Sequence, residues 1–356
     1  MQQETRSLSS PASDEVQIRV ASTGLCGSDL HYYSHFRNGD ILVREPLSLG
    51  HESAGVVTAV GSSVSNLKTG DKVALEVGLP CEQCQRCQQG RYNICKDVRF
   101  RSSGKAFPHF QGTLQERINH PAKWVYKLPE EIGLDVGALL EPLGVALHAF
   151  RRSLMPKDAT VVVFGAGAVG LLCAAVAKLK GAEKVIIADI DAGRLDFAVK
   201  NGFAHNSYTV PMKRGKDIDE NLQIAKDTAA EVGKVDNVGE VDVVFECTGV
   251  PSCVQAGIYV SFGIKRLFDG IFSDRTIVHK TWGSPHAGRH GPSDPNNPSR
   301  SRRSARSRHC RRLPIRQHLP RKHRHRPPSP KIDRRPCLLE AHHTQVLGAR
   351  SGSAGL

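Results

Sequence analysis

Residues 161–191 read VVVFGAGAVGLLCAAVAKLKGAEKVIIADID, and this stretch decides the fold class of the chain. A run rich in β-branched residues ends in Gly165-x-Gly167-x-x-Gly170, an apolar helical pattern follows, and a second apolar strand pattern closes with Asp189. A glycine turn between a strand and a helix, with an acidic residue about 20 positions further on, is typical of a dinucleotide-binding βαβ unit. The alternative is a glycine-rich turn that binds nothing.

The three glycines have separate roles in such a unit. Gly165 permits the tight turn, Gly167 lets the backbone approach a pyrophosphate, and Gly170 allows the helix to pack closely on the strand. We expect Asp189 to accept hydrogen bonds from the adenosine ribose, and its charge would repel a 2′-phosphate, so the pattern favours NAD over NADP. The residues assigned to the cofactor site are Gly165, Gly167, Ala168, Val169, Gly170, Asp189, Arg194, Cys247, Thr248 and Gly249.

Four cysteines, Cys81, Cys84, Cys87 and Cys95, lie close together with the spacing C-x2-C-x2-C-x7-C. Four thiolates in one short segment match the ligand set of a tetrahedral structural zinc. The residues between them are mostly polar, so this segment is not a candidate for the core. Disulfides or scattered free thiols are the alternatives. They fit less well because we expect no signal peptide, and thiols stay reduced inside cells.

A second set of metal-ligand residues lies near the N-terminus, in the sequences GLCGSDLHYY and LGHESAG. Cys26, His51 and Glu52 offer one soft ligand and two harder ones, and three protein ligands with an open position are the pattern of a catalytic zinc. Glu141, at the start of an apolar helical pattern, would ligate the metal directly or through water. Taken singly, Cys26 or His51 is equally well explained as a buried core residue, but the set is far more specific.

The elements around these motifs predict two domains of α/β type overall. Short strand patterns separated by turns predict a small β domain, and alternating strands and helices predict a parallel sheet after it. We place the first domain, with its zinc lobe, at residues 1–147 and the dinucleotide domain at residues 148–261. Expected strands lie at residues 15–22, 54–60, 72–75, 114–118, 207–210 and 240–246, and expected helices at residues 194–200 and 217–232.

The net charge of +14 is concentrated in the C-terminal part of the chain. Residues 262–356 contain 21 Lys and Arg against 5 Asp and Glu, which leaves the preceding part nearly neutral. Residues 284–330 are mostly Arg, Pro, Ser and His, a composition that cannot bury enough apolar surface to offset its ordering entropy. We therefore expect a basic, disordered tail at residues 262–356. Because no apolar run reaches membrane-spanning length, we expect a cytoplasmic protein with no membrane partner.

Five motifs resemble those of the zinc-dependent medium-chain dehydrogenases, and among them the sorbitol/xylitol (polyol) dehydrogenases. They are CGSDLH at residues 26–31, GHE at 50–52, PCEQCQRCQQGRYNIC at 80–95, LEPL at 140–143 and VFECTG at 244–249. The resemblance covers about residues 15–259. It implies a GroES-like β-barrel domain, a Rossmann domain, one catalytic and one structural Zn²⁺, oxidation of a sorbitol-, xylitol- or arabinitol-like polyol by NAD to a ketose, and homo-oligomers.

The resemblance also implies roles for residues close to the second metal set. Ser28 and His31 match the proton relay of the family, Tyr32 matches an aromatic residue of the substrate pocket, and Glu141 matches a carboxylate beside the zinc. The zinc would bind the substrate hydroxyl as a Lewis acid. Other interpretations remain for three of them: Ser28 as a turn residue, His31 as a surface histidine, and Tyr32 as an aromatic that only packs.

The chain departs from the family after Tyr259, where VSFGIKRLFDG leads into the basic tail. We expect the parallel sheet to end at its fourth strand and the activity to be impaired. A shifted reading frame or an unspliced intron is our hypothesis for this break. The rival interpretation is a basic nucleic-acid-binding protein with a zinc ribbon. Against it, the tail has almost no aromatic residues for base stacking, and the four-cysteine loop carries little positive charge.

Overall fold

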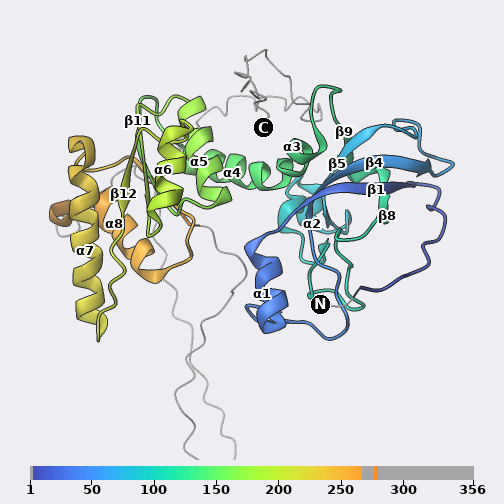
Figure 1. Cartoon of the computed structure of the whole chain (residues 1–356), viewed down its shortest axis with the longest axis horizontal. Coiled ribbons are helices and arrows are strands. Elements are labelled where there is room, and N and C mark those ends of the chain that lie inside the picture. Colours follow the sequence, from blue (N-terminus) through green and yellow to red (C-terminus); the bar gives the residue numbers. More distant parts are fainter. Residues whose placement is uncertain (1–2, 267–275, 280–356) are drawn as a thin grey trace, which may run out of the picture. The chain divides into compact units, whose positions relative to one another are not determined.

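The computed structural model describes residues 3–266 and 276–279 of the chain (Figure 1). These residues form two sheets of five strands each, one antiparallel and one parallel, together with two short two-stranded ribbons. The predicted disordered segment at residues 284–330 lies outside the described residues. Within the described part, no helix is both long enough and apolar enough to cross a membrane.

The N-terminal part is built on the antiparallel sheet, whose strand order is β8-β1-β4-β5-β9. Its strands are β1 (Glu15–Gly24), β4 (Glu52–Val60), β5 (Lys72–Leu75), β8 (Arg117–Pro121) and β9 (Val125–Lys127). Val16, Ile18 and Val57 belong to one buried cluster on this sheet. The strands therefore bury one set of side chains in a core, which is the usual arrangement for an antiparallel sheet with one covered face.

Short elements fill the connections of this part, and most of the expected metal ligands lie beside them. They are α1 (Gly27–His35), β2 (Arg37–Asn38), β3 (Ile41–Leu42), β6 (Gly78–Leu79), α2 (Gln85–Gln88), η1 (Tyr92–Ile94), β7 (Arg99–Phe100), η2 (Ala122–Trp124) and α3 (Leu134–Ala138). β6 pairs with β7, and the four cysteines lie between these two strands in the sequence. The pairing therefore brings the two ends of the four-cysteine lobe together.

One expected strand of this part is displaced. The sequence pattern predicts a strand at residues 114–118, but the strand runs from Arg117 to Pro121. The backbone N–H of Thr113 donates to Gly50 O at 2.8 Å, and that of Leu114 donates to Leu49 O at 2.8 Å. These residues bond to the loop before β4 instead of extending the sheet, and the strand therefore begins later.

The second part is a parallel sheet with the strand order β12-β11-β10-β13-β14. Its strands are β10 (Thr160–Phe164), β11 (Lys184–Asp189), β12 (Asn206–Thr209), β13 (Val243–Glu246) and β14 (Thr276–His279). The helical elements are α4 (Leu140–Ser153), α5 (Ala168–Leu179), α6 (Ala192–Lys200), α7 (Ile218–Lys234), η3 (Val235–Asn237) and α8 (Pro251–Arg266). The order confirms the predicted βαβαβαβ pattern.

Both faces of the parallel sheet are covered. Val161 and Val163 of β10 belong to one buried cluster together with residues of α5, whereas Val162 and Phe164 belong to a second cluster with residues of α7 and α8. A strand buried on both sides explains why β10 reads as a continuous apolar run.

The described chain continues beyond the expected end of this sheet. We expected four strands, but β14 pairs in parallel with β13 as a fifth strand, and α8 continues to Arg266 past the expected boundary at residue 261. Residues 276–278 are Thr, Ile and Val, which are β-branched and favour strands. Pairing with β14 satisfies backbone groups at the outer edge of β13 that a four-strand sheet would leave unpaired.

Candidate metal and dinucleotide sites

Cys26, His51 and Glu52 come together at one end of the antiparallel sheet. Cys26 directly precedes α1, and His51 and Glu52 stand at the start of β4. One ligand atom of each residue lies within 4.8 Å of the others. The antiparallel pairing sets Gly24, at the end of β1, opposite Glu52, which brings the two segments together. A thiolate, an imidazole and a carboxylate at this spacing fit a zinc ion with three protein ligands and one open position.

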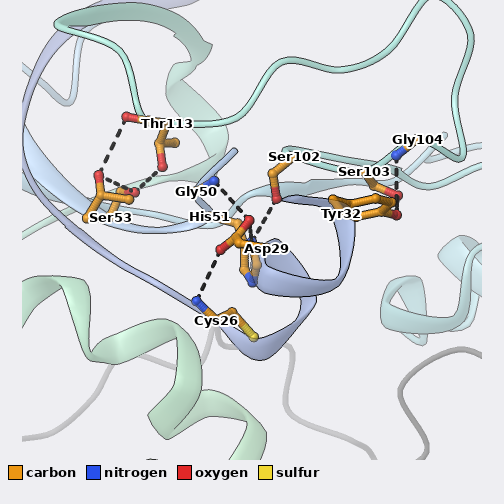
Figure 2. Close-up of polar contacts among 11 residues, drawn as sticks. Cys26, Asp29, Tyr32, Gly50, His51, Ser53, Ser102, Ser103, Gly104 and Thr113 are labelled. Atoms are coloured by element: carbon orange, nitrogen blue, oxygen red, sulfur yellow. Dashed lines mark hydrogen bonds and ion pairs between the residues drawn. The ribbon is translucent and has the colours of Figure 1, made fainter. Parts of the chain in front are cut away.

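Asp29 connects the two loops that supply these ligands (Figure 2). The backbone N–H of Cys26 donates to Asp29 Oδ2 at 3.1 Å, and the backbone N–H of Gly50 donates to Oδ1 at 3.0 Å. Burial raises the pKa of Asp29, but hydrogen bonds from His51 and from these two amides outweigh it, so the pKa lies below its usual value. The carboxylate is therefore charged, and it holds both loops in place.

Residues 100–102 also hold the imidazole of His51 in place. Its Nδ1 lies 2.7 Å from Ser102 Oγ and 3.5 Å from Asp29 Oδ1, and the side chain is 1% exposed. The ring meets Phe100 edge-on, with 5.3 Å between the ring centroids. Because these contacts involve Nδ1, Nε2 is the nitrogen that can ligate a metal ion.

Electrostatics within this group favour a metal cation. Burial raises the pKa of the Cys26 thiol, but hydrogen bonds from His51 and Ser28 outweigh burial and bring the pKa below its usual value. Burial lowers the pKa of His51, but hydrogen bonds to Asp29 and Cys26 outweigh it and raise the pKa to about 10. The site thus stabilises the thiolate form of Cys26, which binds metals, and it stabilises positive charge at His51. A metal cation bound there would displace the imidazole proton.

The expected catalytic residues occupy different environments. Ser28 is buried, and its contact with the Cys26 side chain puts it next to the ligand group. His31 is exposed on α1. Tyr32 is 5% exposed, and its hydroxyl lies 3.3 Å from Ser103 Oγ. Glu141 lies in the first turn of α4 and is not a member of the ligand group among the described residues. Its role beside a metal, like the roles of the other three, remains a prediction.

The four cysteines of the lobe converge as their spacing predicts. Their sulfur atoms lie within 4.8 Å of one another, and none of them forms a disulfide. The backbone N–H of Cys84 donates to Cys81 Sγ at 3.3 Å, and the backbone N–H of Cys81 donates to Cys95 Sγ at 3.3 Å. Sulfurs that gather in this way and accept backbone N–H groups fit a tetrahedral zinc-thiolate centre.

Contacts with η2 attach the lobe to the antiparallel sheet. Lys123 Nζ lies 2.6 Å from Glu82 Oε2, and the ring of Trp124 lies 5.1 Å from that of Tyr92. Glu82 and Tyr92 stand within the cysteine motif, whereas Lys123 and Trp124 stand between β8 and β9. The position of the lobe therefore depends on the sheet as well as on its own cysteines.

The glycine turn follows β10 and leads into α5. Gly165 has a φ of +101°, in the region that favours glycine. A Cβ atom at Gly170 would overlap the carbonyl oxygen of Gly165, so only glycine permits this close approach of helix and turn. A Cβ atom at Gly167 would meet nothing within 4 Å. The turn therefore exposes backbone at Gly167 while it packs tightly at Gly170, which is the arrangement that a pyrophosphate-binding turn requires.

Asp189 at the end of β11 closes this turn. Its Oδ2 accepts the backbone N–H of Ala166 at 2.6 Å, and its Oδ1 accepts the backbone N–H of Asp191 at 2.9 Å. The carboxylate therefore stands beside the turn and is 9% exposed. Arg194, in the first turn of α6, donates its backbone N–H to Asp191 Oδ1 at 3.1 Å. A cofactor contact of Asp189 or Arg194 remains a prediction.

Residues 247–249, the other expected cofactor loop, follow β13. The backbone N–H of Cys247 donates to Phe164 O at 2.8 Å, which places this loop next to the end of β10. Glu246 is buried and accepts hydrogen bonds from the Thr248 hydroxyl and from the backbone N–H groups of Thr248 and Gly249. The loop is therefore held beside the glycine turn by a buried carboxylate.

Comparison with known proteins identifies the family. Residues 12–130 match the alcohol dehydrogenase GroES-like domain, and residues 168–261 match the zinc-binding dehydrogenase family. A probable D-xylulose reductase A of Emericella nidulans is 45% identical over 246 residues, which are 69% of this chain and 65% of that protein. The chain belongs to the zinc-binding dehydrogenases. It spans just under two thirds of the length of the curated relatives it matches.

Solved structures of zinc-binding dehydrogenases and related enzymes share the fold. Galactitol-1-phosphate dehydrogenase from Escherichia coli has a TM-score of 0.61 and 30% identity, over 73% of this chain and 68% of that chain. 2R,3R-butanediol dehydrogenase from Bacillus subtilis has a TM-score of 0.59 and 30% identity, over 72% of this chain and 70% of that chain. The predicted fold class, a GroES-like domain followed by a Rossmann parallel sheet, is confirmed. The family match ends at residue 261, close to the break expected after Tyr259.

Three residues that shape the sites of this zinc-binding dehydrogenase were not predicted from the sequence: Asp29, Ser102 and Glu246. Asp29 carried a usable signal, because an acidic residue three positions after a residue that precedes a helix commonly accepts a backbone N–H there. Glu246 lies within the ECTG motif, but its side chain serves the loop and not a ligand group. Ser102 carried no signal, because it reaches His51 from 51 residues away along the chain.

Proposed function

We propose that this chain is a zinc- and NAD-dependent polyol dehydrogenase that oxidises a secondary hydroxyl to a ketone. The observation that carries the proposal is the convergence of Cys26, His51 and Glu52 into one ligand group in a chain that also contains the glycine turn and Asp189. The first group fits zinc with an open position, and the second arrangement fits a dinucleotide. Together they would supply the two parts of an alcohol oxidation, a Lewis acid for the hydroxyl and an acceptor for the hydride.

The residues around the ligand group suggest how the proton leaves. Zinc held by the three ligands would supply a Lewis acid that makes an alcohol hydroxyl easier to deprotonate. Ser28, which contacts Cys26, would accept the hydroxyl proton as it gives up its own proton toward His31. His31, exposed one turn of helix away, would take up that proton and release it to solvent. The carbinol carbon gives up a hydride to the nicotinamide. The alcohol thus loses one proton and one hydride, which balances its oxidation to the ketone.

The cofactor assignment is supported by the position of Asp189. Its carboxylate stands beside the backbone at Ala166, where the adenosine ribose lies when the pyrophosphate occupies the glycine turn. A negative charge there favours the two ribose hydroxyls of NAD over a 2′-phosphate. Arg194 and residues 247–249 border the same end of the sheet, and we assign them to the cofactor site with Ala168 and Val169.

The substrate class is supported by the relatives. Their names state action on xylulose, galactitol 1-phosphate and butanediol, which are small molecules carrying several oxygen functions. We therefore propose a polyol such as xylitol or sorbitol in preference to a simple monohydric alcohol. Glu141, in the first turn of α4, is proposed to approach the metal, and Tyr32 to hold the backbone of residues 103–104 beside the substrate.

We further propose a cytoplasmic homo-oligomer that does not act on nucleic acid. No observation in the described residues favours the nucleic-acid alternative, and the basic residues that suggested it lie at 262–356. Because the family match ends at residue 261, we also propose that this basic part lowers turnover. Replacing the chain after Tyr259 with the corresponding part of a family member is then expected to raise polyol oxidation without changing the zinc content.

The test is NAD reduction by the purified full-length chain of known zinc content, with xylitol, sorbitol and ethanol as substrates. We expect oxidation of the polyols in preference to ethanol, and loss of activity in the His51→Ala variant with the fold retained. NADP in place of NAD should support a lower rate.

Two results would overturn the proposal. One is polyol oxidation that is unaffected by His51→Ala, because the ligand group would then have no role. The other is tight, salt-dependent binding of nucleic acid by a chain that does not bind NAD, which would favour the rival function.

A further inference from the structure

We propose that Ser102 is a positioning residue for the metal ligand His51, and that residues 100–104 connect the four-cysteine lobe to the metal group at Cys26, His51 and Glu52. This inference rests on the proposed function in one respect: it takes that group to be a zinc site. The Ser102 hydroxyl would fix the orientation of the imidazole and thereby the aim of its Nε2 (Figure 2).

The distances favour Ser102 over Asp29 as the acceptor for Nδ1. Ser102 Oγ lies at 2.7 Å from Nδ1, which is a normal hydrogen bond, whereas Asp29 Oδ1 lies at 3.5 Å. The two oxygens of Asp29 already accept the backbone N–H groups of Cys26 and Gly50. When Nε2 ligates a metal, Nδ1 carries the only ring proton and donates it to one partner. The two residues therefore differ in their main role: Asp29 holds the ligand loops and makes the longer contact with the ring, whereas Ser102 makes the shorter contact, which sets the orientation of the ring.

The backbone at Ser102 is held in an uncommon conformation. Its φ is +61°, in the left-handed region where a residue with a Cβ atom is disfavoured. The side chain is 2% exposed, and the backbone N–H donates to Phe110 O at 2.9 Å. Strained residues of this kind persist where the surrounding structure over-determines them, and they gather at functional sites. The strained backbone conformation occurs at Ser102, the residue whose hydroxyl contacts His51.

Arg101 is the anchor that holds this conformation. Its side chain is 5% exposed and its guanidinium lies 4.4 Å from the centre of the Phe110 ring. It donates hydrogen bonds to three groups of the surrounding chain, Gln111 O at 3.0 Å, Asn119 O at 2.6 Å and His120 Nδ1 at 3.0 Å. Burial lowers the pKa of Arg101 to about 10, so it stays charged at neutral pH. The residue directly before Ser102 is thus fixed to the sheet.

The flanking residues fix the segment at both ends. On one side, Phe100 packs edge-on against the His51 ring, and β7, which contains Phe100, pairs with β6. On the other side, the backbone N–H of Gly104 donates to the Tyr32 hydroxyl at 3.3 Å. Because the four cysteines lie between β6 and β7, a metal ion that orders the lobe also fixes the start of this segment. The lobe is therefore connected to His51 through five consecutive residues.

The experiment measures metal binding on the full-length chain. Wild type, Ser102→Gly, Ser102→Ala and the matched control Ser103→Ala are dialysed against zinc buffers of graded free zinc, and bound zinc is counted. We call the zinc at Cys26, His51 and Glu52 the labile metal, because that site has an open position, and the zinc of the four-cysteine lobe the tightly held metal. Co²⁺ is then loaded in place of the labile metal, and its visible absorption bands are recorded. Thermal unfolding of each variant is measured in parallel, because Ser102→Gly relieves the left-handed backbone and should not lower stability.

We expect Ser102→Gly and Ser102→Ala to weaken the labile metal by about 10- to 100-fold and to shift its Co²⁺ bands, with the tightly held metal unchanged. Ser103→Ala, whose hydroxyl contacts Tyr32, should bind both metals as wild type does. Cys84→Ser should weaken binding of the labile metal, because residues 100–104 connect the lobe to His51. The effect of Cys84→Ser should be smaller in a chain that already carries Ser102→Gly.

The outcomes separate this inference from the proposed function. A wild-type chain that never binds a second metal refutes the zinc site, and both proposals fall. A wild-type chain that binds two metals, with Ser102→Gly and Ser102→Ala unchanged in affinity and Co²⁺ spectrum, overturns only the role of Ser102.

Discussion

Gly24 provides the space in which the Glu52 carboxylate lies. A Cβ atom at Gly24 would overlap Glu52 Oε2 and approach Glu52 Cβ to 3.1 Å. The two residues are paired across β1 and β4, so this contact is built into the sheet register. The absence of a side chain on one strand therefore leaves room for the carboxylate of a candidate metal ligand on the other.

The variant Gly24→Ala tests this relationship. We expect Glu52 to be displaced and the labile metal to bind at least about tenfold more weakly, because a carboxylate that has moved no longer meets Cys26 and His51. Zinc counting by dialysis measures the effect. Gly27→Ala is the matched control, since a Cβ atom there meets nothing within 4 Å. Equal metal affinity in both variants would show that Glu52 does not depend on the space at Gly24.

Cys84→Ser should remove the tightly held metal. A serine hydroxyl is a poor zinc ligand, and a structural zinc contributes directly to folding, so the folding yield and the melting temperature should both fall. Metal content and thermal unfolding are the measurements. Cys253→Ser, at a half-buried cysteine of α8, should retain both metals. A wild-type ratio of one zinc per chain that Cys84→Ser leaves unchanged would contradict the assignment of two sites.

Asp189→Ala should narrow the preference for NAD over NADP. The change removes the acceptor for the ribose hydroxyls and for the Ala166 N–H, so NAD should bind more weakly. It also removes the negative charge that repels a 2′-phosphate, so NADP should bind more tightly. Fluorescence titration with NADH and NADPH measures both affinities. Asp196→Ala, which removes an exposed carboxylate of α6, serves as the control. If wild type binds the two cofactors equally well, Asp189 does not contact the ribose.

His120 should make the antiparallel sheet sensitive to acid. It is fully buried, accepts from Arg101 Nε at 3.0 Å and donates from Nε2 to Glu76 O at 3.0 Å. Burial and the neighbouring guanidinium lower the pKa of His120 to about 3. In the unfolded chain, histidine has a pKa near 6.5. Between about pH 6.5 and pH 3, His120 is therefore protonated in the unfolded chain but not in the folded one. Stability is then fully present above about pH 6.5 and falls toward pH 3 by up to about 1.4 kcal/mol per pH unit.

Urea unfolding between pH 7 and pH 4, followed by tryptophan fluorescence, measures this dependence. His120→Gln keeps an acceptor and a donor but cannot be protonated, so its stability should be lower at pH 7 and less dependent on pH. His148→Gln, at an exposed position of α4, should keep the wild-type dependence. An unchanged pH dependence in His120→Gln would assign the acid sensitivity to other groups.

Several features could be predicted from the sequence because they depend on neighbours along the chain. The C-x2-C-x2-C spacing puts Cys81, Cys84 and Cys87 within one short loop, so they converge in almost any fold of that segment. The glycine turn from Gly165 to Gly170 is equally local, because its tight approach involves residues five positions apart. Patterns of this kind also identified the family and the fold class, and they predicted Cys26, His51 and Glu52, which the structure brings together.

Other features were decided by contacts between distant segments. The strand predicted at residues 114–118 shifted to Arg117–Pro121 because the N–H groups of Thr113 and Leu114 bond to the loop before β4. The fifth strand, β14, forms because the edge of β13 offers backbone partners for it. The composition of residues 262–356 does not indicate that such partners are available. In both cases the outcome depends on which backbone groups elsewhere in the chain remain to be satisfied.

The sequence by itself determined which residue types can bind zinc and a dinucleotide, because that chemistry belongs to single side chains at short spacings. Only the tertiary structure decided how the ligands are aimed. Gly24 leaves room for Glu52 through strand register, and Ser102 reaches His51 through a strained backbone that Arg101 anchors. The physical reason is that a hydrogen bond fixes direction only when its two partners are held by the rest of the fold, and no local pattern specifies where a partner 51 residues away will lie.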